Sequence, residues 1–201
     1  MNKYNKGFQA KIGHLLDLYR IATFNFSNPH SYTKYRQIKA LKYKTSSKML
    51  IETGTFRGVT TKRCASIFDK LYTIELDEKL ANEASKNLSK RKNIKVLQGD
   101  ATIELSNILQ NEEVNNILVF LDGHFSGGIT ACGKIPEPAI EELKVLSRYK
   151  EKINCIIIDD FRCFGNNGFT EKSSIIKALE DEFSDFELNI HLDQIIAYTT
   201  N

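Results

Sequence analysis

The sequence lacks several features that would assign it to a specialised class of protein. Its four cysteines, Cys64, Cys132, Cys155 and Cys163, include no pair with the spacing of a metal-ligand or redox motif. Long apolar runs are absent, so we expect no segment to span a bilayer, and residues 1–6 contain no apolar signal region. We therefore expect a reduced, cytoplasmic protein in which Cys64 and Cys155 are small core residues.

A strong charge of either sign is also lacking. The 28 Lys and Arg residues and the 25 Asp and Glu residues leave a net charge of only +3. Basic residues are scattered along the chain apart from the run at 86–95, which we interpret as a solvated helix end. With so mild a charge and no recognisable RNA-binding module, we expect a small-molecule partner, no nucleic acid and no membrane. A homodimer is compatible with the sequence.

What the chain does have is a regular alternation of strand and helix patterns. Strand-like runs lie at 48–53, 71–75, 94–98, 117–121 and 155–159, with helical patterns at 60–68, 78–90, 102–110, 137–149 and 173–183. Such alternation predicts an α/β protein with a mostly parallel sheet and helices on both faces. Two last strands, at 186–192 and 195–199, are too close for a crossover and predict an antiparallel hairpin, hence one reversed strand near the end.

Two more helical patterns, at 8–20 and 32–43, precede the first strand and are separated by a break at 27–31. The length suits one domain. We therefore predict a helical cap at 1–45 joined to a domain at 46–201 as one structural unit. The sequence leaves open whether the cap covers an edge of the core or roofs a substrate pocket.

The stretch 49–58 is the most informative part of the chain. An apolar strand ends at Glu52, and the chain then turns through Gly54 and Gly58 into a helical pattern. Glycines permit a tight turn and a close approach of a ligand to the backbone, and open α/β sheets bind ligands at the carboxyl ends of their strands. The stretch therefore predicts a nucleotide-type binding site.

Acidic residues lie at or just after the carboxyl end of each predicted parallel strand. They are Glu52, Glu75, Asp100, Asp122 and the pair Asp159–Asp160. Because the carboxyl ends of parallel strands share one edge, these side chains should converge, although carboxylates brought together repel one another. A ligand with hydroxyls and a cation, or a metal ion, would explain the arrangement.

Each acid has a functional and a structural interpretation. Glu75, about twenty residues after the glycine turn, is placed to accept from ribose hydroxyls, or it is a surface residue at a strand end. Asp100 accepts from an adenine amino group, or caps the following helix, or does both through different atoms. Asp122, Asp159 and Asp160 together suit Mg²⁺, unless one of the pair is a cap and Asp122 binds only the organic cofactor.

The segment after Asp122 supplies a candidate base. His124 can accept a proton from a hydroxyl at neutral pH, or it is a loop histidine bonded to backbone. The small residues at 126–133 form either a loop that closes over the substrate or a plain connector.

Residues 48–199 together resemble the class I S-adenosylmethionine-dependent methyltransferases, a family with seven strands of which the last is reversed. The usual first motif, acid-x-Gly-x-Gly-x-Gly, reads Glu52-Thr53-Gly54-Thr55-Phe56-Arg57-Gly58 here. The aromatic in the middle slot, with Tyr72-Thr73-Ile74-Glu75, resembles the catechol and caffeoyl-CoA type. The acids at 122 and 159–160 resemble those of metal-dependent sugar O-methyltransferases.

This resemblance implies a Rossmann-like three-layer sandwich and a set of binding roles. The implied cofactor-binding residues are Glu52, Gly54, Thr55, Phe56, Gly58, Glu75, Asp100, Ala101 and Asp122, and the implied Mg²⁺ ligands are Asp122, Asp159 and Asp160. The lysine that the catechol type has three residues after its metal-binding Asp is replaced by Phe125. His124, with Asp122, is therefore the implied catalytic pair.

The sequence thus predicts metal-assisted O-methylation of a small hydroxylated molecule such as a sugar. One alternative is a module that binds S-adenosylmethionine or a nucleotide without chemistry. Another is a nucleic-acid methyltransferase, although those that act on amino groups usually carry Asn/Asp-Pro-Pro-aromatic where this chain has Leu121-Asp122-Gly123-His124. A dehydrogenase is disfavoured because Phe56 occupies the middle glycine position of its fingerprint.

Overall fold

The computed structural model describes residues 7–25, 28–111, 113–122, 138–166 and 169–200. Within these ranges the chain forms a seven-stranded sheet with the order β3-β2-β1-β4-β5-β7-β6. The strands are β1 (Met49–Thr53), β2 (Lys70–Glu75), β3 (Ile94–Gln98), β4 (Ile117–Leu121), β5 (Ile153–Ile158), β6 (Phe186–His191) and β7 (Gln194–Thr199). Strands β1 to β5 pair in parallel, and β7 pairs antiparallel with both β5 and β6. The expected α/β fold with one reversed strand is confirmed.

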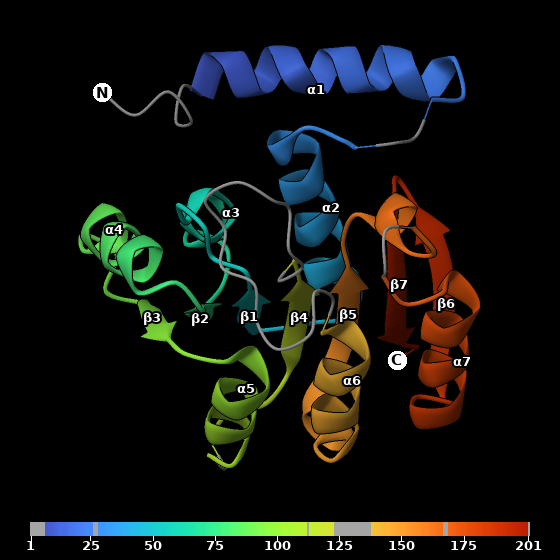
Figure 1. Ribbon diagram of the computed structural model, residues 1–201. Helices are drawn as coiled ribbons and strands as arrows, with labels where there is room; N and C mark the ends of the chain where they lie inside the picture. Colours follow the sequence, from blue (N-terminus) through green and yellow to red (C-terminus); the bar gives the residue numbers. More distant parts are fainter. Residues whose placement is uncertain (1–6, 26–27, 112, 123–137, 167–168, 201) are drawn as a thin grey trace.

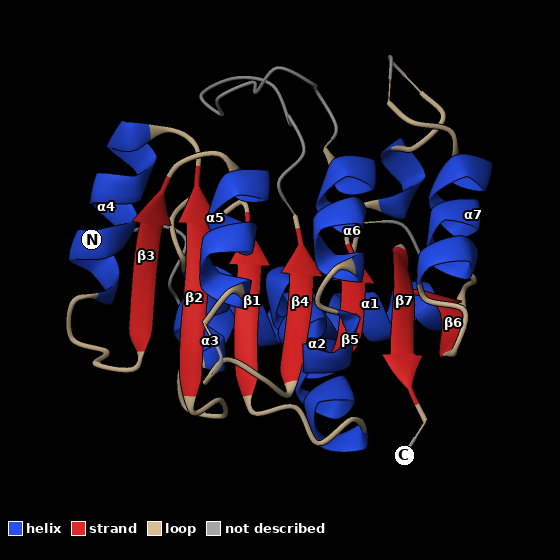
Figure 2. Ribbon diagram, turned by 90° about the horizontal axis from the view of Figure 1, so that it is seen from below, coloured by secondary structure: helices blue, strands red, loops and turns tan. Residues whose placement is uncertain are grey.

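Helices cover both faces of this sheet (Figure 1). They are α1 (Gly7–Ala22), α2 (Ser31–Lys44), α3 (Val59–Cys64), α4 (Glu78–Leu88), α5 (Ala101–Leu109), α6 (Ala139–Ser147) and α7 (Lys172–Glu182). Helices α5, α6 and α7 lie on one face, whereas α2, α3 and α4 lie on the other. Figure 2 shows β1 to β5 pointing in one direction, so their carboxyl ends lie at a common edge.

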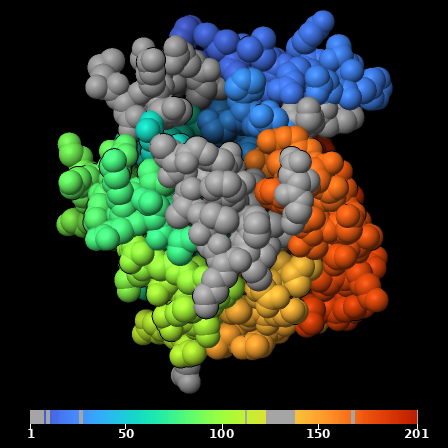
Figure 3. Space-filling model, viewed as in Figure 1, coloured from blue at the N-terminus to red at the C-terminus, as the bar shows by residue number. Residues whose placement is uncertain are grey.

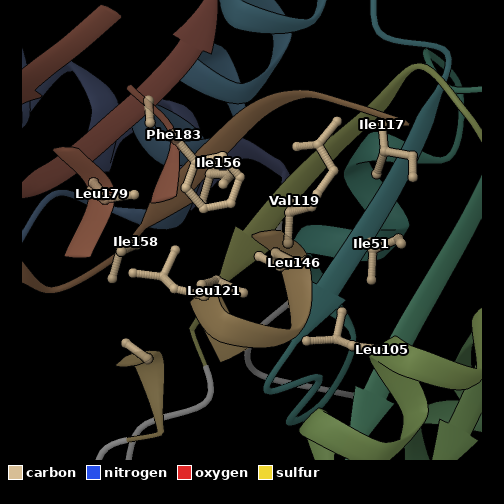
Figure 4. Packing of buried hydrophobic residues seen from close by; sticks show 14 of the residues in the cluster. Ile51, Leu105, Ile117, Val119, Leu121, Leu146, Ile156, Ile158, Leu179 and Phe183 are labelled. Atoms are coloured by element: carbon tan, nitrogen blue, oxygen red, sulfur yellow. The ribbon is translucent and has the colours of Figure 1, made fainter. Parts of the chain in front are cut away.

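The central strands are apolar because both of their faces are covered. All five residues of β4 are buried, and alternate residues enter two different clusters. Val119 and Leu121 pack toward α5, α6 and α7, where Leu105, Leu146 and Leu179 meet them (Figure 4). The other cluster joins Leu118 and Phe120 to residues of α2 and α3, among them Ile38, Leu41 and Cys64. The period of two in a sheet thus places successive apolar side chains in opposite layers.

The two N-terminal helices are attached in different ways. Helix α2 inserts Ile38 and Leu41 into the core, whereas α1 lies across the outside of α2 (Figures 1 and 3). Helix α1 faces α2 with Gly13, where an added Cβ would come within 2.7 Å of the His30 ring, and with the buried Asp17. Its other side exposes large apolar residues, including Phe8 and Tyr19. The described residues contain no helix with the length and apolar character needed to cross a membrane.

Candidate active site

The strand-end acids meet along the edge that the sequence predicts. Asp122 donates its backbone N–H to the Thr53 carbonyl at 3.2 Å, and Asp159 donates its own to the Leu121 carbonyl at 3.0 Å. These bonds hold the ends of β1, β4 and β5 level with one another. The structure therefore brings Glu52, Asp122 and Asp159 to one edge of the sheet.

The glycine turn after β1 adopts left-handed backbone conformations at three positions. Gly54 has φ of 79° and Gly58 has φ of 68°, and a Cβ on Gly58 would lie 2.8 Å from Cδ1 of Leu88. Phe56 also has a positive φ, 48°, which costs free energy in a residue with a side chain. Its backbone N–H donates to Oε2 of Glu75 at 2.7 Å, and this bond holds the turn in place.

Glu52 is almost completely buried at the end of β1. Its Oε2 accepts hydrogen bonds from the hydroxyl of Thr73 at 2.7 Å and from the hydroxyl of Thr61. Burial raises the pKa of Glu52 to about 7; the two hydroxyl bonds oppose that shift and the nearby charge of Glu75 adds to it. A carboxyl that is only partly ionised at neutral pH suits a cationic ligand, because a bound positive charge would lower its pKa and keep it ionised.

Glu75 and Asp100 both make structural bonds in addition to their expected ligand roles. Glu75 accepts from Phe56 through Oε2 and from the backbone N–H of Asp77 at 3.1 Å through Oε1. Asp100 is the N-cap of α5, where its Oδ1 accepts from the Thr102 backbone at 2.9 Å and from the Thr102 hydroxyl at 2.5 Å. Carboxylate oxygens have further lone pairs, so these bonds are compatible with ligand binding. Ala101 is the first residue of α5.

The adjacent acids after β5 converge on a cation from the cap. Asp160 has φ of 51°, so the chain turns sharply after Asp159 and both carboxylates reach the Nζ atom of Lys34. Asp159 Oδ2 forms the closer contact, and Asp160 Oδ1 lies 3.2 Å from Nζ. The common point predicted for the pair therefore exists, but it holds the ammonium of Lys34 from α2.

Further bonds fix this ion cluster. Gln194 on β7 donates to Asp159 Oδ1 at 2.8 Å, and Arg162 donates to Asp160 Oδ1 at 2.8 Å. Burial alone would lower the pKa of Lys34, but the carboxylates of Asp159, Asp122 and Asp160 raise it well above its ordinary value. Burial and the charge of Asp159 raise the pKa of Asp122, with Lys34 acting in the opposite direction.

These residues do not fit the expected Mg²⁺ site as the structure arranges them. The cation among the carboxylates is the Lys34 ammonium, whose side chain is only 13% exposed. Among the residues that the structure describes, no group of three His, Cys, Asp or Glu side chains is placed to hold a metal ion. The expectation of bound Mg²⁺ therefore finds no support.

Two expected elements of the site lie outside the described residues: the candidate base His124 and the segment 126–133. Two other features were missed in the sequence. The sequence did not indicate that Lys34 belongs to the site, because the acids that it contacts are 125 and 126 residues away along the chain. The second is a charge asymmetry: residues 1–48 contain ten Lys and Arg and a single acid, Asp17, which a count by segment would have found.

Several solved structures with the same architecture bear the name of an O-methyltransferase. A "putative caffeoyl-CoA O-methyltransferase" from Staphylococcus aureus aligns over 95% of this chain and 94% of its own length, with TM-score 0.56 and 18% identity. The O-methyltransferase from Bacillus cereus, solved with SAH, covers 84% of this chain and 81% of its own, with TM-score 0.59 and 15% identity. TomG from Streptomyces achromogenes, solved with SAM, covers 96% of this chain and 99% of its own, with TM-score 0.57 and 12% identity. At these identities the likeness shows the fold.

The sequence comparisons contradict the expectation of a protein with no nucleic-acid partner. Probable ribosomal RNA small subunit methyltransferases A from Methanococcus maripaludis strains C5 and S2 are 35% and 34% identical over 74 residues, which are 36% of this chain. The matched region spans only 28% of each relative. The model of the ribosomal RNA adenine dimethylase family matches residues 25–174, three quarters of the chain and all of its strand-end acids. The chain therefore belongs to the ribosomal RNA adenine dimethylase family and has the class I S-adenosylmethionine-dependent methyltransferase fold.

Proposed function

We propose that this S-adenosylmethionine-dependent methyltransferase methylates the exocyclic amino group of an adenine in RNA. The observation that carries the proposal is the family match over residues 25–174, which extends from before α2 to the first turn of α7. It includes Glu52, Glu75, Asp100, Asp122 and the Asp159–Asp160 pair. A match confined to the glycine turn would support cofactor binding alone.

The cofactor would lie over the ends of β1 and β2. Glu52 is suited to the positively charged methionine end, because a bound ammonium would stabilise its buried carboxylate. Glu75 would accept from ribose hydroxyls, and Asp100 would accept from the adenine amino group through Oδ2, for which the described residues provide no donor. When bound, S-adenosylmethionine supplies an activated methyl group on a sulfonium.

Asp122 would act on the acceptor side, since it follows β4 directly and stands beside the cofactor-binding strand ends. A carboxylate can accept a hydrogen bond from an adenine amino group, which orients the nitrogen lone pair and receives the proton released by methylation. In the sequence an aromatic residue, Phe125, follows three positions later, as in the amino-group methylation motif. Aromatic side chains stack on bases that have left a helix.

The distribution of charge supports an RNA partner. Residues 1–48 carry ten basic residues and one acid, whereas the remaining residues carry 18 basic and 24 acidic residues. Exposed basic residues continue along α2 and the chain after it: Arg36, Lys39, Lys44 and Lys48. Lys and Arg neutralise phosphates and thereby supply most of the sequence-independent affinity for nucleic acids. The small net charge of the whole chain conceals this difference between its parts.

The test is methyl transfer from labelled S-adenosylmethionine to RNA, followed by digestion to nucleosides. We expect label in N6-methylated adenosine, and a loss of about a hundredfold or more in rate for Asp122→Ala, which removes the hydrogen-bond acceptor, with cofactor binding unchanged. Label in other nucleosides, or none in RNA whose adenines are accessible, would refute adenine methylation.

A second candidate, O-methylation of a small hydroxylated molecule, is favoured by the solved structures of the same fold. Sugars and catechols tested in the same assay would separate the two functions. Cofactor binding without label in either class of acceptor would favour a module without catalysis.

A further inference from the structure

We propose that Lys34 is the resident cation of this active site, and that its ammonium occupies the place where related sheets could bind a divalent ion. Lys34 would thereby exclude metal from the acidic cluster and hold helix α2 against the strand ends. This inference concerns the cation and is independent of which acceptor is methylated.

Both carboxylate oxygens of the buried Asp159 have bonding partners. Asp159 is fully buried, with Oδ2 bonded to Lys34 and Oδ1 bonded to Gln194. Asp160 Oδ1 is shared between Lys34 and the Arg162 guanidinium. Both acids thus meet positively charged or polar donors that come from α2, from β7 and from the turn after β5.

A divalent ion would have to displace this arrangement. Mg²⁺ demands oxygen ligands at about 2.0–2.1 Å in a near-octahedral shell. Lys34 Nζ lies between the two carboxylates, in the position that the ion would need, whereas Arg162 contacts Asp160 and is also paired with Asp193. Arg162 is itself held by Asp193 at the turn between β6 and β7, where its backbone N–H donates to Asp193 Oδ1 at 2.7 Å.

Lys34 also links two parts of the chain that are far apart in sequence. It is the fourth residue of α2, while Asp159 is the residue after β5. Because α2 packs through Ile38 and Leu41 into the core, the lysine stem is held in position by the helix. Lys34 is therefore a positioning residue, which sets the charge of the acceptor side and the place of the cap helix.

Binding of Mn²⁺, followed by electron paramagnetic resonance, tests the proposal without any acceptor. Mn²⁺ takes the same oxygen ligands as Mg²⁺ and is observed directly. The wild-type protein should bind no Mn²⁺ at this cluster, and Lys34→Met, which keeps the stem and removes the charge, should gain one bound ion. Adding Asp159→Asn to Lys34→Met should abolish the gained site.

Two controls keep the outcomes separate. Lys34→Arg keeps the positive charge and should bind no Mn²⁺, and calorimetry with S-adenosylmethionine reports whether each variant is folded. A wild-type Mn²⁺ site that disappears in Asp159→Asn would overturn the proposal. So would a folded Lys34→Met protein that gains no ion. If Lys34→Met does not fold, the Mn²⁺ titrations of the wild type and of Lys34→Arg decide the question: both should bind no ion at this cluster, and binding by either would overturn the proposal. Failure of RNA methylation would leave these results unaffected.

Discussion

A single residue, Glu52, shows how the proposed cofactor site lowers the stability of the fold. Its carboxyl lies almost without solvent contact at the end of β1, among hydroxyl donors from Thr61 and Thr73. Two neutral donors cannot replace the hydration of a full negative charge. The ionised carboxylate of Glu52 therefore lowers the stability of the protein without ligand, and the proposed cationic ligand would offset that cost.

The pH dependence of stability should reveal this cost. The pKa of Glu52 is about 7 in the folded protein, against 4.5 as its ordinary value. The folded state then holds the proton more tightly, so Glu52 stabilises the fold most below pH 4.5, and this contribution is lost as pH rises to 7. The loss amounts to about 3 kcal/mol.

Glu52→Gln should remove this loss. The measurement is thermal denaturation of the variant and the wild type without cofactor at pH 5 and at pH 8. The difference in stability between the two proteins should shift in favour of the variant from pH 5 to pH 8. Its affinity for S-adenosylmethionine should fall at least tenfold. The exposed Glu180→Gln is the control and should show neither effect. An equal difference between Glu52→Gln and the wild type at both pH values would contradict the assigned pKa.

At the scale of elements, the turn between β1 and α3 is shaped by its contact with α4. Gly58 combines a left-handed φ with a close approach to Leu88, whereas Gly165 has φ of 79° with only the flexible Glu171 carboxylate nearby, at 3.3 Å. The two glycines thus separate the effect of backbone conformation from the effect of packing.

Gly58→Ala should cost about 3 kcal/mol of unfolding free energy, because a strained φ and a core contact add together. Gly165→Ala should cost about 1 kcal/mol, since only the backbone is strained. Urea denaturation of both variants measures the difference. Equal losses of unfolding free energy in the two variants would show that the Leu88 side chain can move away from the added methyl group without destabilising the protein.

One buried carboxylate, that of Asp17, contributes several hydrogen bonds to the attachment of α1. Asp17 accepts from the His30 backbone at 2.7 Å, from the His30 ring at 2.6 Å and from the Thr33 hydroxyl. Burial would raise the pKa of Asp17, but the bonds from Thr33 and His30 keep it below its ordinary value. Since α1 turns most of its large apolar residues outward, these polar bonds and the contacts of His14 with Thr33 and Tyr32 join it to α2.

Asp17→Ala should release α1, while the sheet stays folded. Hydrogen exchange of α1 amides should accelerate by about tenfold or more, which corresponds to the loss of roughly 1–3 kcal/mol on leaving buried donors without an acceptor. Exchange in β4 should be unchanged. Leu15→Ala alters an exposed residue of the same helix and should leave α1 protected. Unchanged protection in Asp17→Ala would show that other contacts hold the helix.

At the scale of the whole molecule, charge is divided between the basic N-terminal segment and the acidic remainder. If this segment contacts RNA phosphates, affinity should depend steeply on salt. The double substitution Arg36→Glu/Lys39→Glu should weaken RNA binding at least tenfold and reduce the slope of affinity against salt concentration.

Lys90→Glu/Lys92→Glu is the matched control, because it makes the same change in charge at an exposed turn distant in sequence. Filter binding at several salt concentrations measures both variants. Equal losses of affinity in the two variants would mean that RNA binding depends on the net charge of the protein and not on a particular surface of α2.

The sheet could be predicted because its information is local. Each strand is a short apolar run, and the acid after it marks the carboxyl end, so the meeting of Glu52, Asp122 and Asp159 followed from parallel pairing alone. Lys34 could not be predicted, since no spacing relates it to a partner 125 residues away. The proposed RNA partner was missed because the charge summed over the whole chain hides the difference between the basic residues 1–48 and the acidic remainder.

The link from Lys34 to Asp159 and on to Gln194 has a consequence for synthesis. Lys34, the first partner in this series of bonds, is synthesised early, and Gln194, the last, cannot emerge from the ribosome before residue 194 has been added. Strands β1 to β4 can pair during translation, but the cluster cannot close until the final hairpin is available. We therefore expect nascent chains to acquire their methyl-donor pocket before they acquire a fixed acceptor side.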